Sequence, residues 1–315
     1  MNTRRFALKT MAAMTTLGLF AGNHAFADAA HPKVALVMKS LANEFFQTMQ
    51  DGAKAYQKQH SKDFDLISNG IKDETDTAAQ IKIVQQMMVE KVDAIVIAPA
   101  DSKALVPVLK EATAKGIIVV NIDNKLDTDA LKEKGISVPF VGPNNRTGAK
   151  LVGDYLAKTL KAGDKVAILE GVSTTLNAQQ RTAGFKDAMA TVKATVTNVQ
   201  SGEWEMDKAN TITSAMLRET PDLKAILAGN DNMALGAVAA IKTAGKTGKV
   251  KVVGYDNISA IQPMLKDGRV LATADQYGAQ QAVFGIETAL KSVKAKTPQN
   301  QLPPVVETKV KLVTK

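Results

Sequence analysis

Short apolar runs alternate along the chain with longer segments in which apolar residues recur every three or four positions. The first unit is 33–46, KVALVMKSLANEFF, which predicts an apolar strand, a polar turn and the aromatic start of an amphipathic helix. A strand this apolar suits a parallel sheet that is covered on both faces. Ligands of such sheets lie beyond the carboxyl ends of the strands, so we expect Lys39, Asn43, Phe45 and Phe46 beside a ligand. The alternative for the two phenylalanines is packing of the first helical turn.

The same alternation continues to the end of the chain. Further strands are predicted at 64–68, 94–98, 117–122, 137–141, 165–170, 195–200, 225–228, 250–255, 271–274 and 305–313. Helices are predicted at 75–90, from Asp101 or Ser102 to 115, and at 146–160, 175–192, 206–219, 232–244, 259–266 and 278–294, while 128–135 reads as an insertion. Strands that alternate with helices indicate a parallel α/β architecture.

The two halves of the chain resemble each other in detail. The strand at 120–123 reads VNID and the strand at 253–256 reads VGYD, so that each half ends an equivalent strand in an aspartate, Asp123 or Asp256. One such carboxylate is usually a turn or a helix cap, whereas two at matching positions favour a binding site. Two similar lobes with facing strand ends enclose a cleft, and such clefts are preferred ligand sites.

We therefore predict an α/β protein with two similar lobes, each a doubly wound parallel sheet, joined by a three-strand hinge. The expected N-terminal lobe comprises 28–142 and 277–302, and the expected C-terminal lobe comprises 143–276 and 303–315. At 315 residues the chain is long enough for two such units.

The first 27 residues read as a signal peptide. Arg4, Arg5 and Lys9 form a basic region, 11–21 is apolar, and 25–27 (AFA) is a small-x-small cleavage site. The basic run also resembles a twin-arginine signal. The apolar stretch is too short for a membrane anchor, so we expect a periplasmic chain that begins near residue 28.

Composition excludes several kinds of chemistry. The chain has no cysteine, which excludes disulfides, zinc–thiolate sites and thiol catalysis. Its three histidines are His24, His31 and His60, all near the N-terminus, which disfavours a histidine triad or a multi-histidine metal site. The formal net charge is +9, but the lysines are spread among acids, as on a solvated surface, so we expect no nucleic-acid partner.

No motif in the sequence requires catalysis or a cofactor. The stretch 245–247 (GKT) resembles the end of a phosphate-binding loop, but Ala240 stands where the first glycine would be and a helix precedes it instead of a strand. No glycine-rich dinucleotide motif follows a predicted strand. We predict a binding protein without enzyme activity, cofactor or metal.

The polar and aromatic residues at the predicted strand ends suit a polyol. Carboxylates and amides bind hydroxyl groups, cations add charge-assisted donors, and aromatic rings cover the apolar faces of a sugar. For Trp204 the alternative is a surface or core position. The candidate ligand-binding residues are Lys39, Asn43, Phe45, Phe46, Asp123, Asn124, Arg181, Trp204, Asn230, Asp256 and Gln276.

The chain resembles the periplasmic sugar-binding proteins of ABC importers, of the ribose- and allose-binding type. By that resemblance all of these candidate residues except Lys39 and Asn124 fall on the sugar-contacting positions of the family. The resemblance covers nearly all of the chain after residue 27, and its motifs are 39–46, Ile122-Asp123, Arg181 with Gly184-Phe185, 229–236, 253–256 and Gln276. It implies hinge closure around a neutral sugar or sugar alcohol and delivery to an ABC permease in the inner membrane. A chemoreceptor is a further partner that the resemblance allows, and we expect a monomer.

The chain departs from the ribose-binding pattern at three positions. Asn124 stands in place of an arginine, Pro143 in place of a serine, and Lys39 in place of a smaller polar residue. Lys39 and the insertion after residue 125 are closer to the allose-binding branch. From the shorter Asn124 side chain we expect ribose to bind less tightly than a hexose such as allose or a sugar alcohol such as xylitol.

Two other functions fit part of the pattern. Sugar-responsive repressors share this core, but they carry a DNA-binding helix-turn-helix of roughly 60 residues before it. Only 32 residues precede Lys33 here, and they read as the signal peptide. A periplasmic sugar hydrolase would need a positioned acid with a nucleophile or base, for which Asp123 and Asp256 are the available pair.

Overall fold

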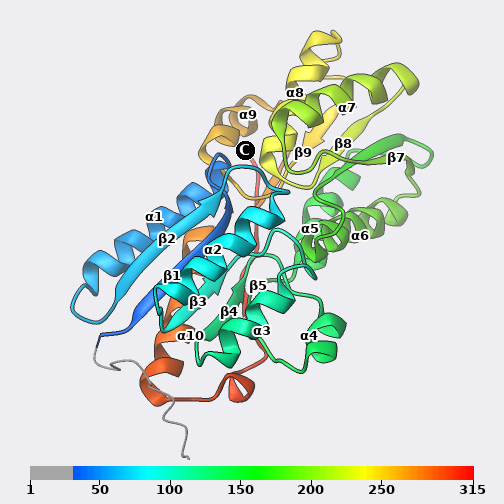
Figure 1. The fold of residues 1–315 in the computed structure, drawn as a ribbon. Coiled ribbons are helices and arrows are strands. Elements are labelled where there is room, and N and C mark those ends of the chain that lie inside the picture. Colours follow the sequence, from blue (N-terminus) through cyan, green and yellow to red (C-terminus); the bar gives the residue numbers. More distant parts are fainter. Residues whose placement is uncertain (1–30) are drawn as a thin grey trace, which may run out of the picture.

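The computed structural model describes residues 31–315 as two α/β lobes (Figure 1). The predicted fold class is confirmed, because each lobe has a central sheet of mostly parallel strands with helices on its faces. The predicted signal peptide lies outside the described residues. Among the helices of 31–315, none combines the length and the apolar character that a membrane span needs.

The N-terminal lobe is built on a six-stranded sheet whose neighbouring strands all run parallel. Its central strands are mostly apolar and buried, as expected of a sheet that helices cover on both faces. The strands, in order across the sheet, are β11 (Val305–Thr308), β5 (Phe140–Pro143), β4 (Ile118–Ile122), β3 (Ala94–Ile97), β1 (Lys33–Ser40) and β2 (Asp65–Ile71).

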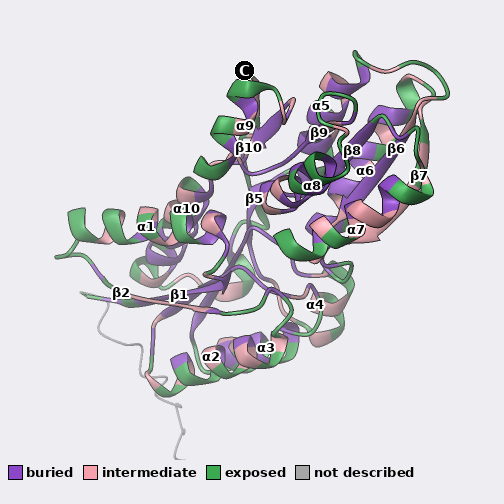
Figure 2. Ribbon diagram, turned by 90° about the horizontal axis from the view of Figure 1, so that it is seen from above, coloured by how far each residue is buried: buried purple, intermediate pink, exposed green. Residues whose placement is uncertain are grey.

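Strand β1 shows how this sheet divides its side chains between two apolar layers. Val34 and Leu36 pack in the cluster that contains residues of α1 (Glu44–Gln59) and α10 (Gly278–Ala295). Ala35 and Val37 point to the other face, into the cluster under α2 (Thr77–Val89) and α3 (Val106–Ala114). Figure 2 shows the buried sheet between helices with exposed outer faces. Because successive side chains of a strand point to opposite faces, β1 contributes to both apolar layers.

The C-terminal lobe repeats this plan. Four parallel strands lie in the order β7-β6-β8-β9, and a bridge between Val253 and Ala272 extends the sheet to the antiparallel pair β10 and β12. The strands are β6 (Lys165–Glu170), β7 (Thr195–Ser201), β8 (Ala225–Ala228), β9 (Lys251–Val253), β10 (Thr273–Asp275) and β12 (Lys311–Val313). The helices are α5 (Asn145–Ala157), α6 (Leu176–Thr191), α7 (Met206–Glu219), α8 (Asp231–Thr243), the short 3₁₀ helix η1 (Ser259–Ile261) and α9 (Gln262–Asp267).

Helices α5 and α6 approach each other so closely that a glycine is required between them. A Cβ atom at Gly184 would lie 2.2 Å from the carbonyl oxygen of Arg146. Any side chain at this position would therefore push the helices apart. The close contact fixes α6 against α5, and α6 carries Arg181.

The chain crosses between the lobes three times: after β5, after β10, and between β11 and β12. The last crossing corrects the predicted single strand at 305–313, which was assigned to the C-terminal lobe. It is two strands, of which β11 pairs with β5 in the N-terminal lobe and β12 pairs with β10 in the other. Pairing partners so far apart in sequence are not visible in a local apolar pattern.

Two further predictions differ from the structure. The segment 128–135 is the helix α4 (Thr128–Lys134), which Asp127 caps by accepting a bond from the Ala130 backbone at 2.8 Å. Helix α3 begins at Val106 instead of following Asp101 directly, because the Asp101 carboxylate holds a turn through the backbone of 103–104. A short 3₁₀ helix, η2 (Gln299–Gln301), precedes β11.

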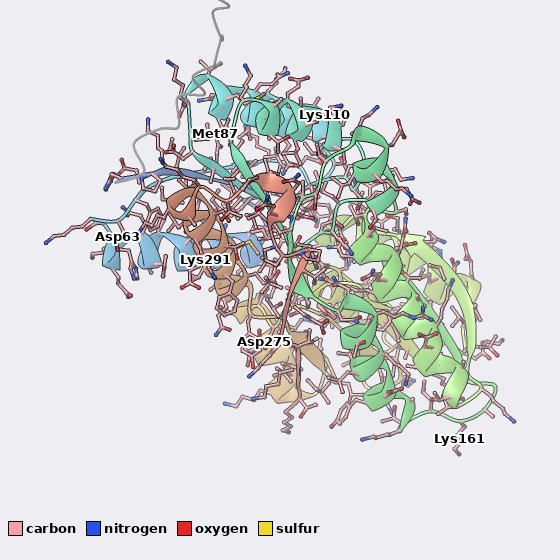
Figure 3. The ribbon with its side chains drawn as sticks, turned by 90° about the horizontal axis from the view of Figure 1, so that it is seen from below. Asp63, Met87, Lys110, Lys161, Asp275 and Lys291 are labelled. Atoms are coloured by element: carbon pink, nitrogen blue, oxygen red, sulfur yellow. The ribbon has the colours of Figure 1, made fainter. Side chains whose placement is uncertain are left out.

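Lysines lie on the outer surface of both lobes, as their spacing among acids predicts. Lys110 on α3, Lys161 in the loop before β6 and Lys291 on α10 are exposed at separate places on the surface (Figure 3). The net positive charge is therefore dispersed instead of gathered into one binding face.

Candidate functional site

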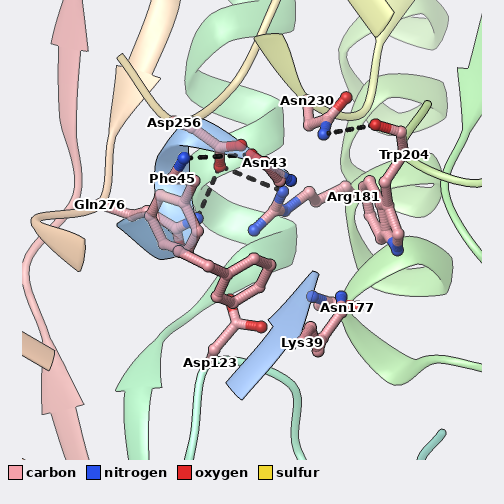
Figure 4. Close-up of a pocket in the computed structure, with 11 residues that line it drawn as sticks. Lys39, Asn43, Phe45, Asp123, Asn177, Arg181, Trp204, Asn230, Asp256 and Gln276 are labelled. Atoms are coloured by element: carbon pink, nitrogen blue, oxygen red, sulfur yellow. Dashed lines mark hydrogen bonds and ion pairs between the residues drawn. The ribbon is translucent and has the colours of Figure 1, made fainter. Parts of the chain in front are cut away.

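Residues that follow the strands of both sheets line one pocket between the lobes (Figure 4). The empty space at the pocket is about 220 Å³, which includes the part that opens to solvent, and the most accessible of the lining residues, Asp256, is only 8% exposed. Both lobes are therefore closed over it. The lining residues are Lys39, Asn43, Phe45, Phe46, Asp123, Asn177, Arg181, Trp204, Asn230, Asp256 and Gln276.

All the predicted candidates except Asn124 lie on this pocket. Asn124 is fully buried, and its side chain donates to the carbonyl oxygen of Pro99 at 3.0 Å. Asn124 therefore does not line the pocket in this closed arrangement, and its predicted contact with a ligand is not part of the site as the structure arranges it. Asn177, which the sequence did not single out, lines the pocket instead, and the side chain of Glu74 lies behind Lys39.

Lys39, Asn43 and Glu74 form a buried polar group on the N-terminal lobe. Asn43 caps α1 by accepting from the Phe45 backbone N–H at 3.0 Å, and its amide donates to Glu74 Oε1 at 3.0 Å. The other carboxylate oxygen of Glu74 lies 3.2 Å from Lys39 Nζ, an ion pair with both side chains at most 2% exposed. Burial raises the pKa of Glu74, and Lys39 and the Asn43 amide oppose that shift. This group holds the Lys39 ammonium at the wall of the pocket.

Aromatic rings surround the Lys39 ammonium. Its Nζ lies 5.2 Å from the ring centroids of Phe46 and Trp204, which come from opposite lobes. The rings of Phe45 and Phe46 meet edge to face at 5.2 Å. Both phenylalanines line the pocket and also belong to the apolar core, so the two roles proposed for them are combined.

Arg181 is held in place by groups of the C-terminal lobe. Its Nε donates to Asn145 Oδ1 at 2.8 Å, and its Nη1 donates to the Gly229 carbonyl oxygen at 2.9 Å. The guanidinium carbon lies 3.8 Å from the centroid of the Tyr255 ring, on which it stacks. Nη1 is also 3.5 Å from Asp256 Oδ1, so the arginine is fixed before any ligand contact.

The two aspartates at matching strand ends reach the pocket from opposite lobes. Asp123 and Asp256 both have left-handed backbones, with φ of 60° and 117°. Such strain typically costs on the order of 1–3 kcal/mol and is concentrated at functional sites. Oδ1 of Asp256 accepts from Gln276 at 2.7 Å, whereas Oδ2 of Asp123 is buried with no hydrogen-bond partner among the described residues. Burial raises the pKa of Asp123, with Lys39 and Arg181 opposing the shift.

Trp204 and Asn230 complete the wall on the C-terminal lobe. Asn230 caps α8 by accepting from the Met233 backbone at 2.9 Å, and its amide donates to the Trp204 carbonyl oxygen at 3.2 Å. The Trp204 ring lies within 5.4 Å of both the Lys39 ammonium and the Arg181 guanidinium. The indole is only 2% exposed, which excludes the surface alternative.

The pocket has acceptors and donors that the protein does not use. Within residues 31–315, Oδ2 of Asp123 is buried without a hydrogen-bond partner. The amide oxygen of Asn177 accepts from the Ala178 backbone N–H, while the Asn177 NH₂ group makes no bond in the same range. The pocket is lined by two cations and two carboxylates, and Glu74 behind Lys39 adds a third carboxylate. The positive charge is therefore balanced, without the cationic excess that would favour a phosphate. Among residues 31–315, no cluster of three acids and histidines could hold a metal. The arrangement suits a neutral ligand with several hydroxyl groups.

Comparison with known proteins decides the family. Residues 34–297 match the model of the periplasmic binding protein domain. The chain belongs to this family. Its match covers both lobes and every residue of the pocket, and it agrees with the resemblance seen in the sequence.

Three relatives show how close the match is. The D-ribose/D-allose-binding protein of Pseudomonas aeruginosa is 68% identical over 283 residues, which are 90% of this chain and 89% of that protein. An ABC transporter solute-binding protein from Burkholderia multivorans is 71% identical, with a TM-score of 0.89 over 90% of this chain and 99% of that one. An ABC transporter periplasmic solute-binding protein from Actinobacillus succinogenes 130z, solved with bound D-allose, is 36% identical. Its TM-score is 0.84 over 90% of this chain and 98% of that one.

Proposed function

We propose that this protein is the periplasmic sugar receptor of an ABC importer, and that it captures a neutral monosaccharide between its lobes by hinge closure. One observation carries this proposal: two buried carboxylates, Asp123 and Asp256, face one closed pocket from opposite lobes. Each accepts hydrogen bonds from sugar hydroxyls, so one sugar links both lobes. Relatives in this family that are named for ribose and allose support the proposal.

The size and walls of the pocket favour a single sugar unit. The pocket is small and closed, because its lining residues come from both lobes and none of them is more than 8% exposed. Phe46 and Trp204 offer apolar faces to the C–H groups of a sugar ring, while Arg181 and Asn177 offer donors. A polyol with apolar ring faces satisfies both kinds of wall.

The position of Asn124 changes the expected choice of sugar. The expectation that ribose binds less tightly than allose rested on Asn124 as a shortened ligand contact, and this residue does not line the pocket. We therefore expect both ribose and allose to bind, as the name of the Pseudomonas relative suggests. Lys39 and Asn177 become the residues expected to select between sugars.

The partners follow from the same function. We propose export by the segment 1–27, and delivery of the sugar by the closed monomer to an inner-membrane permease. A chemoreceptor is a second proposed partner. The solved relatives described as ABC transporter solute-binding proteins support the permease.

Titration calorimetry with ribose, allose, xylitol and ribose 5-phosphate tests the ligand class. We expect binding of ribose and allose, and none of the phosphate, because the pocket has no cationic excess. Asp123→Ala should weaken binding by at least about tenfold, since it removes an acceptor for hydroxyls. Asp222→Ala, which removes an exposed carboxylate paired with Lys165, is the matched control and should bind normally. Preference for the phosphate, or no binding of any neutral sugar, would refute the proposal.

Sugar affinity is expected to fall below about pH 7 because of Asp256. Burial raises the pKa of this carboxyl to about 7; Arg181 and Lys39 oppose the shift, and Asp123 adds to it. A ligand hydroxyl donates a stronger hydrogen bond to the ionised form than to the protonated form, so binding lowers this pKa. The contribution of ionised Asp256 to sugar affinity is therefore complete above about pH 7. As the pH falls below this value the contribution is lost, and the affinity decreases by up to about tenfold per pH unit.

Calorimetry at a series of pH values measures this dependence. Asp256→Asn cannot ionise, so it should bind more weakly at neutral pH and show a flatter profile. An equally steep profile in the variant would assign the titration to another group.

A further inference from the structure

Helix α6 begins without a cap from the residue that precedes it, although the Asn177 side chain accepts from the Ala178 N–H in its first turn at 2.9 Å. The first N–H groups of a helix have no intrahelical partner and need an acceptor. Thr175 occupies the cap position, but its hydroxyl donates to the Val172 carbonyl oxygen at 2.6 Å and makes no cap bond. By contrast, α1, α5 and α8 at the same cleft are each capped by an asparagine that precedes them.

The missing cap comes from the opposite lobe. Leu176 N–H donates to the Ser102 hydroxyl oxygen at 3.0 Å, and Asn177 N–H donates to Asn124 Oδ1 at 3.3 Å. Ser102 and Asn124 belong to the N-terminal lobe and are at most 2% exposed. Two side chains of one lobe thus complete a helix of the other.

Both acceptors are held by their own lobe. The Ser102 hydroxyl donates to the Lys125 carbonyl oxygen at 2.8 Å, and the Asn124 amide donates to the Pro99 carbonyl oxygen at 3.0 Å. These bonds lie within the N-terminal lobe, so they persist when the lobes separate. Only the bonds to α6 depend on closure.

We propose that Ser102 and Asn124 are positioning residues that stabilise the closed arrangement by capping α6 across the cleft. The inference rests on the proposed function. Helix α6 also carries Asn177 and Arg181, which line the pocket. Closing the lobes therefore completes the helix on which two ligand contacts lie, one turn apart. Because these bonds exist in only one of two arrangements, they shift the equilibrium between them and thereby the affinity.

A second contact between the lobes provides a comparison. Glu44 of α1 accepts bonds from the backbone N–H groups of Ser259 and Ala260, at 2.6 and 3.3 Å. This contact is exposed to solvent, whereas the cap on α6 is largely buried. Water replaces the exposed bonds more readily, so Glu44→Ala should change affinity less than removal of the α6 cap.

The first test is calorimetry and stopped-flow binding with Ser102→Ala and Asn124→Ala. The Trp204 indole, the only tryptophan, reports binding by its fluorescence. We expect each variant to bind ribose and allose more weakly by the same factor, roughly five- to thirty-fold, mostly through faster dissociation. A changed ratio between the two sugars would instead make the residue a ligand contact. Unchanged affinity in both variants would overturn the proposal.

The second test acts on the other partner of the same bond. Leu176→Pro removes the N–H group that donates to the Ser102 hydroxyl oxygen. Proline is tolerated at the first position of a helix, and the preceding residue, Thr175, has the extended backbone that proline requires, with ψ of 135°. Leu176→Ala keeps the N–H and is the matched control. The proline variant should bind sugar at least about threefold more weakly than the alanine variant, with equal melting temperatures without sugar. Equal affinities of the two variants would contradict the proposal.

Closure can also be measured without sugar. The chain has no cysteine, so Thr48→Cys on α1 and Lys266→Cys on α9, both exposed, attach one spin label to each lobe. Pulsed electron paramagnetic resonance should show a smaller closed fraction in Asn124→Ala than in its Asn124 parent. Equal closed fractions in the two proteins would contradict the proposal that Asn124 stabilises the closed arrangement. If the unmutated protein binds no sugar, the proposed function fails. The comparison of closed fractions still tests whether the cap on α6 stabilises closure, because it is made without sugar.

Discussion

Replacing Glu74 with alanine is expected to abolish tight sugar binding and to lower the stability of the fold. The change leaves the Lys39 ammonium 2% exposed with no carboxylate beside it, and it also removes the partner of the Asn43 amide. Breaking a buried ion pair from one side typically costs about 3–5 kcal/mol. Thermal melting measures the loss of stability, and calorimetry with ribose and allose measures the loss of affinity.

A second substitution separates the two effects. Lys39→Met combined with Glu74→Ala removes both charges, so its melting temperature should recover toward that of the unmodified protein. Sugar affinity should stay low, because Lys39 lines the pocket. Glu111→Ala on α3, an exposed position, is the control for loss of a glutamate. If the double variant melts as low as Glu74→Ala, the ion pair is not what holds this region together.

Much of the fold and of the pocket was predictable because both depend on local patterns. Strands with short apolar runs, separated by amphipathic helices, define the sheets and the direction of their strands. The carboxyl ends of parallel strands meet at one edge, which brings Asp123 and Asp256 to the same cleft. The repeat of the aspartate in both halves is what distinguished a site from two ordinary turns.

Asn124 shows why a sequence neighbour of a site residue need not belong to the site. Asp123 has a left-handed backbone with φ of 60°, which turns the chain at the end of β4. The next side chain consequently points away from the pocket, toward Pro99 and the start of α6. A strand-end motif predicts the position of the loop but not the direction of each side chain within it.

Glu74 and Asn177 were missed for different reasons. Glu74 follows β2 in a loop with another acid, Asp73, and only the tertiary structure shows which carboxylate pairs with Lys39. Asn177 had a usable signal, because it lies four residues before Arg181 and thus on the same face of α6. No local signal in the sequence indicated that the last strand is divided into β11 and β12, because both segments pair with strands distant in sequence.

Arg181→Ala is expected to weaken sugar binding by at least about a hundredfold, or roughly 3 kcal/mol. The variant removes a donor that faces the pocket and leaves the buried Asp256 carboxylate without its cation. The Asn145 side chain and the Gly229 carbonyl oxygen also lose their donors. Arg181→Lys keeps the charge but not the planar fork that reaches these groups together, so it should recover only part of the affinity.

The pH profile distinguishes this role from simple loss of packing. Arg181 opposes the raised pKa of Asp256, so its removal should move the pH below which binding weakens to a value above about 7. Calorimetry of both arginine variants across neutral pH provides the measurement. Arg146→Ala, which removes an exposed arginine paired with Asp187, is the control and should keep both the affinity and the profile of the unmodified protein. An Arg181→Ala profile with an unchanged midpoint would show that Asp256 does not depend on this arginine, and that Arg181 acts through packing on Tyr255.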